Sequence, residues 1–255
     1  MNAMTQSAPS PLRSYLLEAR CEFLRLLRTP SFAVPTLLFP PMFYLLFGVL
    51  LNGGHGRGPH AATWLLATYG VFGVMAPGLF GFGVSVALDR ERGFLALKRA
   101  LPVPTGALLL AKMAMAMVFA AVIATVLIAL ATTLGGVSVA PSRLALLWLV
   151  DVLGVLPFCA IGLYIGTTVS GQGAPAVINL LYLPMAFLAG LWLPLSALPA
   201  VFAKLAPLWP AYHLAQVALP AVGLEGTGSV AGHVAVLAAT GLVFFAAARR
   251  RLARA

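Results

Sequence analysis

The chain has 255 residues, of which 61% are hydrophobic and only 9% are charged. Soluble domains carry about a quarter of charged residues, so this composition excludes a soluble domain and indicates an integral membrane protein. The net charge of +10 does not indicate nucleic-acid binding, because the basic residues are dispersed between apolar runs and do not form one patch.

Residues 12–28 form the first predicted element, an amphipathic helix within a cytoplasmic N-terminal segment, 1–31. One face carries apolar residues, namely Leu12, Leu16, Ala19, Phe23 and Leu27, and the opposite face carries Glu18, Glu22, Arg25 and Arg28. A helix this polar cannot span a bilayer, so it is expected to lie in the membrane interface. A soluble helix packed on another element is the alternative.

Six apolar runs follow, each of about 20 to 30 residues and therefore long enough to cross a hydrocarbon core of about 30 Å. They are 32–51, 61–88, 105–134, 143–168, 175–195 and 229–248. The sequence thus predicts an all-α domain of six membrane spans over 32–248, followed by a basic tail, 249–255. Thirteen of the sixteen lysines and arginines fall on the side of the N-terminus, which predicts a multi-pass protein of the cell membrane with both termini cytoplasmic.

Charge is concentrated in the loop from Asp89 to Pro104, between the second and third runs. It carries Asp89, Arg90, Glu91, Arg92, Lys98 and Arg99. Gly93 interrupts the preceding helix, and Phe94, Leu97 and Leu101 then recur at helical spacing until the prolines at 102 and 104. We expect a short amphipathic helix along the membrane surface, with its charged rim open to a partner. An ordinary charged turn that fixes the topology is the alternative.

Two further features lie in the second half of the chain. Asp151 is the one acid placed within a predicted span, so it should face protein or water, either in a proton or substrate role or as a hydrogen-bonded packing residue. The segment 196–224 is too apolar for a solvated loop, yet four prolines divide it. Two short helices that enter the outer leaflet and return are therefore expected between spans five and six.

Two motifs carry a resemblance to a known family. The first is the charged cluster with its glycine, a short helix ending in Arg99-Ala100-Leu101-Pro102-Val103, and Lys112 at the start of the third run. The second is Leu193-Pro194-Leu195-Ser196-Ala197-Leu198-Pro199, followed by Leu208-Trp209-Pro210-Ala211-Tyr212-His213. Together they resemble the ABC-2 type permeases, the membrane subunits of ABC exporters, and the drug-exporter branch in particular.

This resemblance implies a permease that works as a homodimer with separate ATPase subunits, which would bind ATP and magnesium. The charged loop would dock on the ATPase through Asp89, Arg90, Glu91, Arg92, Gly93, Phe94, Leu97, Lys98 and Arg99. An amphiphile such as a drug-like compound, a lipid or a glycolipid would pass between the two copies. Candidate lining residues on spans one, two and five are Phe43, Phe47, Tyr69, Phe72, Tyr182 and Phe187.

Motifs for other chemistry are missing from the chain. It has no GxxxxGK[ST] phosphate loop, no G-x-S-x-G elbow and no HExxH helix, so neither ATP binding nor catalysis is predicted for this chain itself. No metal site is predicted either, and His213 and His233 are interpreted as structural. Two alternatives stay open: an ion- or proton-coupled secondary transporter, for which only Asp151 qualifies as a coupling acid, and an intramembrane enzyme.

Overall fold

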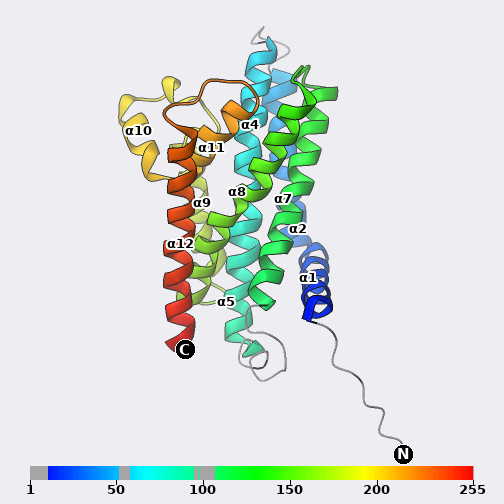
Figure 1. Cartoon of the computed structure of the whole chain (residues 1–255), viewed down its shortest axis with the longest axis vertical. Helices are drawn as coiled ribbons and strands as arrows, with labels where there is room; N and C mark the ends of the chain where they lie inside the picture. Colours follow the sequence, from blue (N-terminus) through cyan, green and yellow to red (C-terminus); the bar gives the residue numbers. More distant parts are fainter. Residues whose placement is uncertain (1–10, 52–57, 95–96, 98–106, 255) are drawn as a thin grey trace, which may run out of the picture.

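The structure, a computed structural model, describes residues 11–51, 58–94, 97 and 107–254. All regular elements in these ranges are helical, which confirms the predicted all-α class. The long helices run roughly side by side in one bundle, and the first and last described helices end at the same end of it (Figure 1). Five segments are long and apolar enough to cross a membrane, namely Pro30–Leu50, His60–Glu91, Leu108–Thr133, Pro141–Thr168 and Val230–Leu252.

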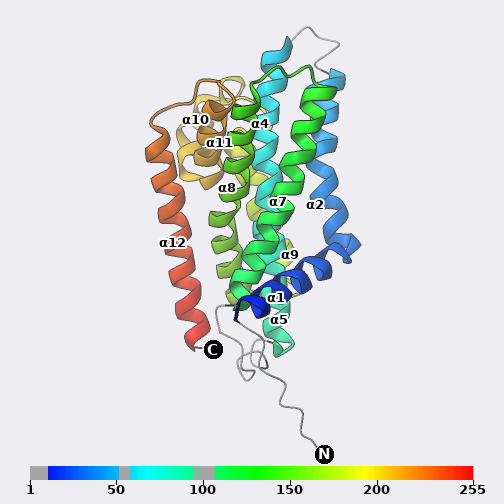
Figure 2. The same cartoon turned by 45° about the vertical axis from the view of Figure 1, so that its right-hand side comes forward.

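The first helix, α1 (Pro11–Leu27), lies across one end of the bundle, as Figure 2 shows. Its packing differs from the expectation drawn from its apolar face. Leu16 and Leu27 of that face are exposed, whereas Glu22 and Leu26 are buried. The face of α1 that carries Glu22 therefore meets the bundle, and the physical reason is a set of ion pairs described below.

The first long segment consists of α2 (Pro30–Phe43) and the π-helical turn η1 (Tyr44–Leu50). Pro35, Pro40 and Pro41 lie inside α2. The helix continues through them and then widens, with the Tyr44 N–H bonding the carbonyls of Pro40 and Pro41. Because proline has no N–H, the ladder is short of donors here, and the wider turn follows directly.

The second long segment and α8 (Pro141–Thr168) pack at the centre of the bundle. The second segment is built from α4 (Gly58–Ala76), the π-helical turn η2 (Pro77–Phe82) and α5 (Gly83–Glu91). A Cβ at Gly162 of α8 would lie 2.6 Å from the carbonyl oxygen of Gly78, and one at Gly166 would lie 2.5 Å from that of Gly83. Gly162 and Gly166, a GxxxG pair on α8, therefore serve packing within the chain, since only glycine allows this approach.

The remaining helices flank this centre: α7 (Ala107–Thr133) and α12 (Val230–Arg254) both pack on α8, and α9 (Ala174–Leu188) packs on α5 and α8. The expected fifth span, 175–195, is wrong in its extent, because α9 has only 15 residues. It ends in a Schellman turn, in which Leu191 N–H bonds Ala186 O at 3.1 Å and Gly190 N–H bonds Phe187 O at 3.0 Å. Gly190 has a φ of +74°, which favours glycine and stops the helix.

The segment after α9 forms short helices at the end of the bundle opposite α1 (Figure 1). They are η3 (Leu195–Ala197), α10 (Ala200–Leu205), η4 (Ala206–Leu208) and α11 (Pro210–Ala221). The two α-helices predicted over 196–224 are thus present, and α11 packs against α4, α8 and α12.

A histidine pair joins α11 to α12. The Nδ1 atoms of His213 and His233 lie 2.7 Å apart, while the two Nε2 atoms bond the carbonyls of Pro207 and Thr227. Because a carbonyl oxygen can only accept, each Nε2 donates to its carbonyl, and the two Nδ1 atoms face each other between α11 and α12. The sequence spacing hides this pairing, since the two histidines are 20 residues apart.

Candidate functional site

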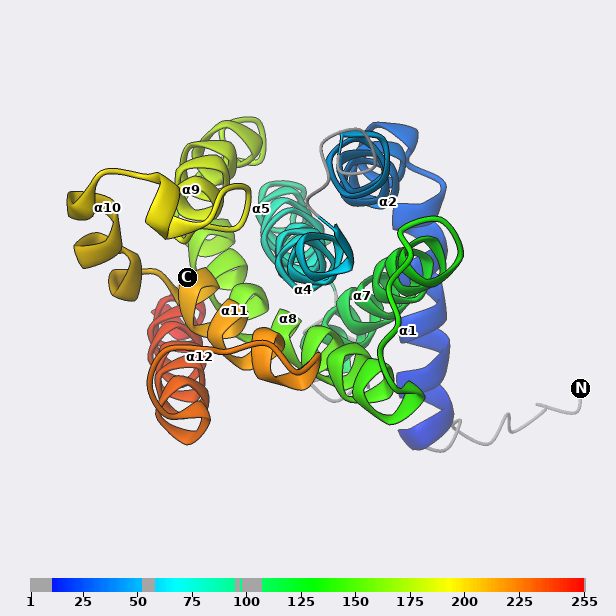
Figure 3. The same cartoon turned by 90° about the horizontal axis from the view of Figure 1, so that it is seen from above.

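Aromatic side chains from α2, η1, α4 and α9 form one cluster. Figure 3 shows α4 beside α2 and α9, and the cluster lies where these helices meet. Phe43 lies 6.1 Å from Phe47, 6.4 Å from Tyr69 and 6.2 Å from Phe72, measured between ring centroids. Phe72 in turn stacks on Tyr182 of α9 at 5.1 Å. The structure therefore brings together five of the six aromatic residues predicted to line the path.

Trp192 completes the cluster and was not among the predicted residues. Its indole lies 6.4 Å from Phe43, 5.6 Å from Phe72 and 6.4 Å from Phe187, so it also connects the sixth predicted residue. Trp192 follows the Schellman turn at Gly190, which carries it back over α9. Trp192 comes one residue after Leu191 in an apolar run, so helical periodicity did not single it out. A tryptophan among spans, whose indole N–H needs a hydrogen-bond acceptor, is the signal that could have found it.

The cluster combines a buried floor with an exposed edge. Tyr69, Phe72 and Tyr182 are buried, whereas Phe43 is half-buried and Phe47 is exposed. The Tyr182 hydroxyl donates to the carbonyl of Phe72 at 3.1 Å, and the buried indole Nε1 of Trp192 has no partner among the described residues. The face is thus mostly apolar, with one hydrogen-bond donor left unused, which suits an amphiphile better than an ion.

Asp151 lies on α8 and faces α4 away from the ring contacts of this cluster. It is 1% exposed, and a Cβ at Gly70 would lie 2.6 Å from its Oδ2, so Gly70 leaves the room that the carboxyl fills. Its Oδ1 has no hydrogen-bond partner among the described residues. It faces protein, one of the two environments expected for it.

A second group of functional residues lies at the α1 end of the bundle, where four charges form a compact cluster. Lys112 of α7 is 0% exposed, and its Nζ lies 2.8 Å from Glu22 Oε2 of α1 and 3.0 Å from Asp89 Oδ2 of α5. Ser85 Oγ accepts its third hydrogen at 3.0 Å. Arg25 adds an ion pair to Asp89 at 2.9 Å. We call Glu22, Arg25, Asp89 and Lys112 the buried charge cluster.

The cluster corrects the interpretation of the charged loop as one water-facing rim. Asp89 is 3% exposed and bonded to two cations, so it joins α1, α5 and α7 and is not free to meet a partner. Arg90 is also committed, because its guanidinium bonds the carbonyls of Thr167 and Val169 at the end of α8. Two of the predicted docking charges therefore stabilise the chain itself.

The rest of the loop is exposed as far as it is described. Glu91, Arg92, Phe94 and Leu97 are exposed, Phe94 by 42% and Leu97 by 59%. Gly93 has a φ of +72°, which interrupts the preceding helix as predicted, and Leu97 N–H bonds its carbonyl at 3.0 Å. Lys98, Arg99 and the rest of the expected helix lie outside the described residues.

The turn after α8 lies beside this loop. A Cβ at Gly171 would lie 2.6 Å from Oε2 of Glu91, so the turn and the loop form one continuous surface with Arg90 beneath it.

Comparison with known proteins matches this chain to a family. The ABC-2 type transporter family profile matches residues 15–220, from α1 through the aromatic cluster to α11. This chain belongs to the ABC-2 type transporter family. It is also 27% identical over 195 residues to "Putative transport permease YvfS" of Bacillus subtilis (strain 168), covering 75% of this chain and 78% of that protein.

Membership in this family bears on both the aromatic cluster and the α1 end of the bundle. ABC-2 permeases are multi-pass membrane proteins, and the family implies an ATPase partner subunit. The α1 end, with its exposed loop, and the aromatic cluster are separate parts of the same bundle, joined by the segment α4–η2–α5 that contributes to both.

Proposed function

We propose that this chain is the permease subunit of an ABC exporter, in which two copies form the path for an amphiphilic substrate and separate ATPase subunits supply the energy. The observation that carries this proposal is the aromatic cluster. It combines buried rings with exposed ones on a single face of the chain, between α2 and α9. A path between two copies requires such a face, apolar enough for a drug-like compound, a lipid or a glycolipid.

The alternatives have less support among the described residues. A secondary transporter would require a coupling acid at the path, but Asp151 faces Gly70 and takes no part in the ring contacts. An intramembrane enzyme would require convergent catalytic groups, and no cluster of three metal-binding side chains occurs in the part of the chain that the structure describes. Neither reading explains the exposed loop at Phe94.

We propose six spans, with α9 as the fifth and α10–α11 as a hairpin that enters the outer leaflet. At about 1.5 Å per residue, the 15 residues of α9 cover roughly 22 Å. The path of the chain supports this assignment: α8 ends at the α1 end of the bundle, and α12 begins at the opposite end, so the segment between them must cross back (Figure 1). In this topology α1 lies along the cytoplasmic interface, with Leu16 and Leu27 toward lipid.

The topology predicts which single cysteines an impermeant thiol reagent reaches from outside the cell. Lys204→Cys on α10 should react, and Arg251→Cys near the end of α12 should react only after permeabilisation; both positions are exposed. A background with Cys21→Ser and Cys159→Ala removes the native thiols, of which Cys21 is exposed. External labelling at Arg251→Cys would contradict the six-span arrangement.

The proposed dependence on a separate ATPase gives the direct test of function. Because the chain has no phosphate loop, the purified protein should hydrolyse no ATP, and an ATP-binding-cassette subunit should copurify with it from its native host. In vesicles, the reconstituted pair should show hydrolysis that an amphiphile stimulates. Sustained hydrolysis by the isolated chain would exclude the permease assignment.

A further inference from the structure

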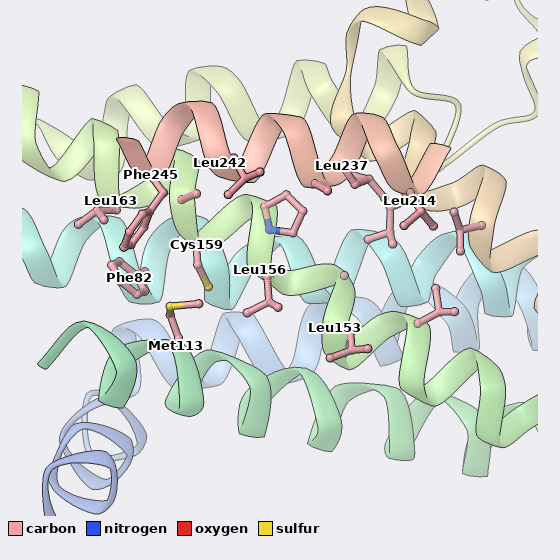
Figure 4. Close-up of a pocket in the computed structure, with 18 of the residues that line it drawn as sticks. Phe82, Met113, Leu153, Leu156, Cys159, Leu163, Leu214, Leu237, Leu242 and Phe245 are labelled. Carbon is pink, nitrogen blue, oxygen red and sulfur yellow. The ribbon is translucent and has the colours of Figure 1, made fainter. Parts of the chain in front are cut away.

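A groove of about 700 Å³ lies between α7, α8, α11 and α12. Figure 4 shows its side chains converging from α8 and α12, with Met113 of α7 and Phe82 closing one wall. Every described residue that lines it is apolar, apart from the thiol of Cys159. It lies on the opposite side of the bundle from the aromatic cluster, since α12 and α8 lie across α4 from α2 and α9 (Figure 3).

The groove is long, narrow and open along one side. Its α8 wall extends from Val150 to Leu163, which at about 1.5 Å per residue is roughly 20 Å. This length exceeds one leaflet of a hydrocarbon core about 30 Å thick. Leu153 and Leu242 at its rim are exposed, so the groove opens sideways from the bundle. In a chain whose helices α7, α8 and α12 cross the membrane, that opening faces lipid.

The chemistry of the groove selects a hydrocarbon chain as its occupant. Water would need two to four polar partners, and the lining offers none besides one thiol. An empty groove would forfeit the dispersion contacts of its walls. A flexible acyl chain is the one hydrocarbon that the surrounding bilayer supplies at this depth.

A positive charge lies where the headgroup of such a lipid would be. Arg249 follows Phe245 of the groove wall by four residues on α12, which places it on the same side of the helix one turn nearer the membrane surface. Arg249 is exposed, and no carboxylate of the described residues is paired with it. Arg251, two residues further, lies on a different side of the helix.

We propose that this groove is a binding site for one anionic phospholipid of the membrane. Its acyl chain lies between α8 and α12, and its phosphate bonds the guanidinium of Arg249. The site is separate from the face proposed for transport, so it would be occupied while the substrate path is empty. It requires only that the chain is inserted in a bilayer, and it does not depend on the identity of the exported compound.

Native mass spectrometry of the purified full chain tests the charged part of the site. The probes are phosphatidylglycerol and phosphatidylcholine with identical sixteen- and eighteen-carbon chains, added in equal amounts. We expect one phosphatidylglycerol to be retained in preference, and Arg249→Gln to lower its retention about tenfold, because a charge-assisted hydrogen bond is lost. Arg251→Gln should leave retention within about twofold. Equal retention of both lipids by the unmodified chain would overturn the anionic assignment.

A pair of glycines on α12 tests the groove itself. A Cβ at Gly241 would meet only the Cα of Pro157, at 3.7 Å, so Gly241→Leu fits the fold and fills the groove. We expect it to lower retention of both lipids at least tenfold, whereas Gly232→Leu on the exposed face near the start of α12 should not. If Gly241→Leu lowers the melting temperature, Ala238→Phe provides a second way to fill the groove.

Two further results would overturn the proposal. Undiminished lipid retention in both groove-filling variants would exclude the site. A disulfide between two copies at Leu242→Cys would show that a second chain covers the groove and would overturn the proposal. Loss of lipid binding with normal transport would leave the proposed function intact, so failure of the two ideas can be distinguished.

Discussion

Lys112→Met is expected to destabilise the protein by about 3 to 5 kcal/mol, because it removes the buried cation that pairs with both Glu22 and Asp89. Methionine has nearly the length of lysine, so the change removes the charge with little change in packing. The loss should appear as a lower melting temperature in detergent, and as weaker attachment of α1 to the bundle. A melting temperature within one degree of the unmodified protein would contradict the role of the buried charge cluster.

Two further variants separate charge from packing at this site. Lys204→Met alters an exposed lysine on α10 and should change stability by less than about 0.5 kcal/mol. The combination of Lys112→Met with Glu22→Gln and Asp89→Asn removes the two acidic charges that lose their shared lysine, so it should recover most of the loss. If the triple variant is no more stable than Lys112→Met, the loss of stability comes from altered packing at the site and not from charge.

Phe94→Asp is expected to abolish substrate-stimulated ATP hydrolysis by the assembled complex while the permease stays inserted and folded. Phe94 is 42% exposed, so its replacement removes little packing within the chain. Exposed ion pairs contribute only about 0 to 1 kcal/mol each, so docking on an ATPase must also rely on apolar contacts, and Phe94 and Leu97 offer them. Hydrolysis and transport by the reconstituted complex measure the effect.

Conservative changes in the same loop serve as controls. Phe94→Leu keeps an apolar side chain and should retain most of the stimulation, and Glu91→Ala should weaken it only modestly. Arg90 is not a suitable control, because its bonds to the end of α8 make any loss ambiguous. Wild-type transport by the Phe94→Asp complex would show that the loop is a topological turn.

Much of the architecture could be predicted because membrane insertion imposes strong local constraints. An uninterrupted apolar run of sufficient length must be helical in a bilayer, so the spans at Pro30–Leu50 and Pro141–Thr168 were predicted to within a few residues. The resemblance named aromatic residues on three predicted spans as candidates for lining a path, and the structure places the rings of two of them, Phe43 and Phe72, in contact. Family resemblance added the order of the elements.

The features that could not be predicted are contacts between residues that are distant in the chain. Asp89 belongs to a charged run and reads as solvent-exposed, yet its partner Arg25 is 64 residues away, and Lys112 lies at the start of another helix. His213 and His233 meet only because α11 lies against α12.

Sequence by itself thus determined the helical class and the membrane setting, which depend on composition and on spacing along one helix, and the resemblance of two motifs indicated the family. Tertiary structure decided which charges are buried as ion pairs, how far α9 extends and where Trp192 lies. The physical reason is that the free energy of a buried charge or ring depends on the groups that surround it, and those groups come from helices whose mutual packing no local pattern encodes.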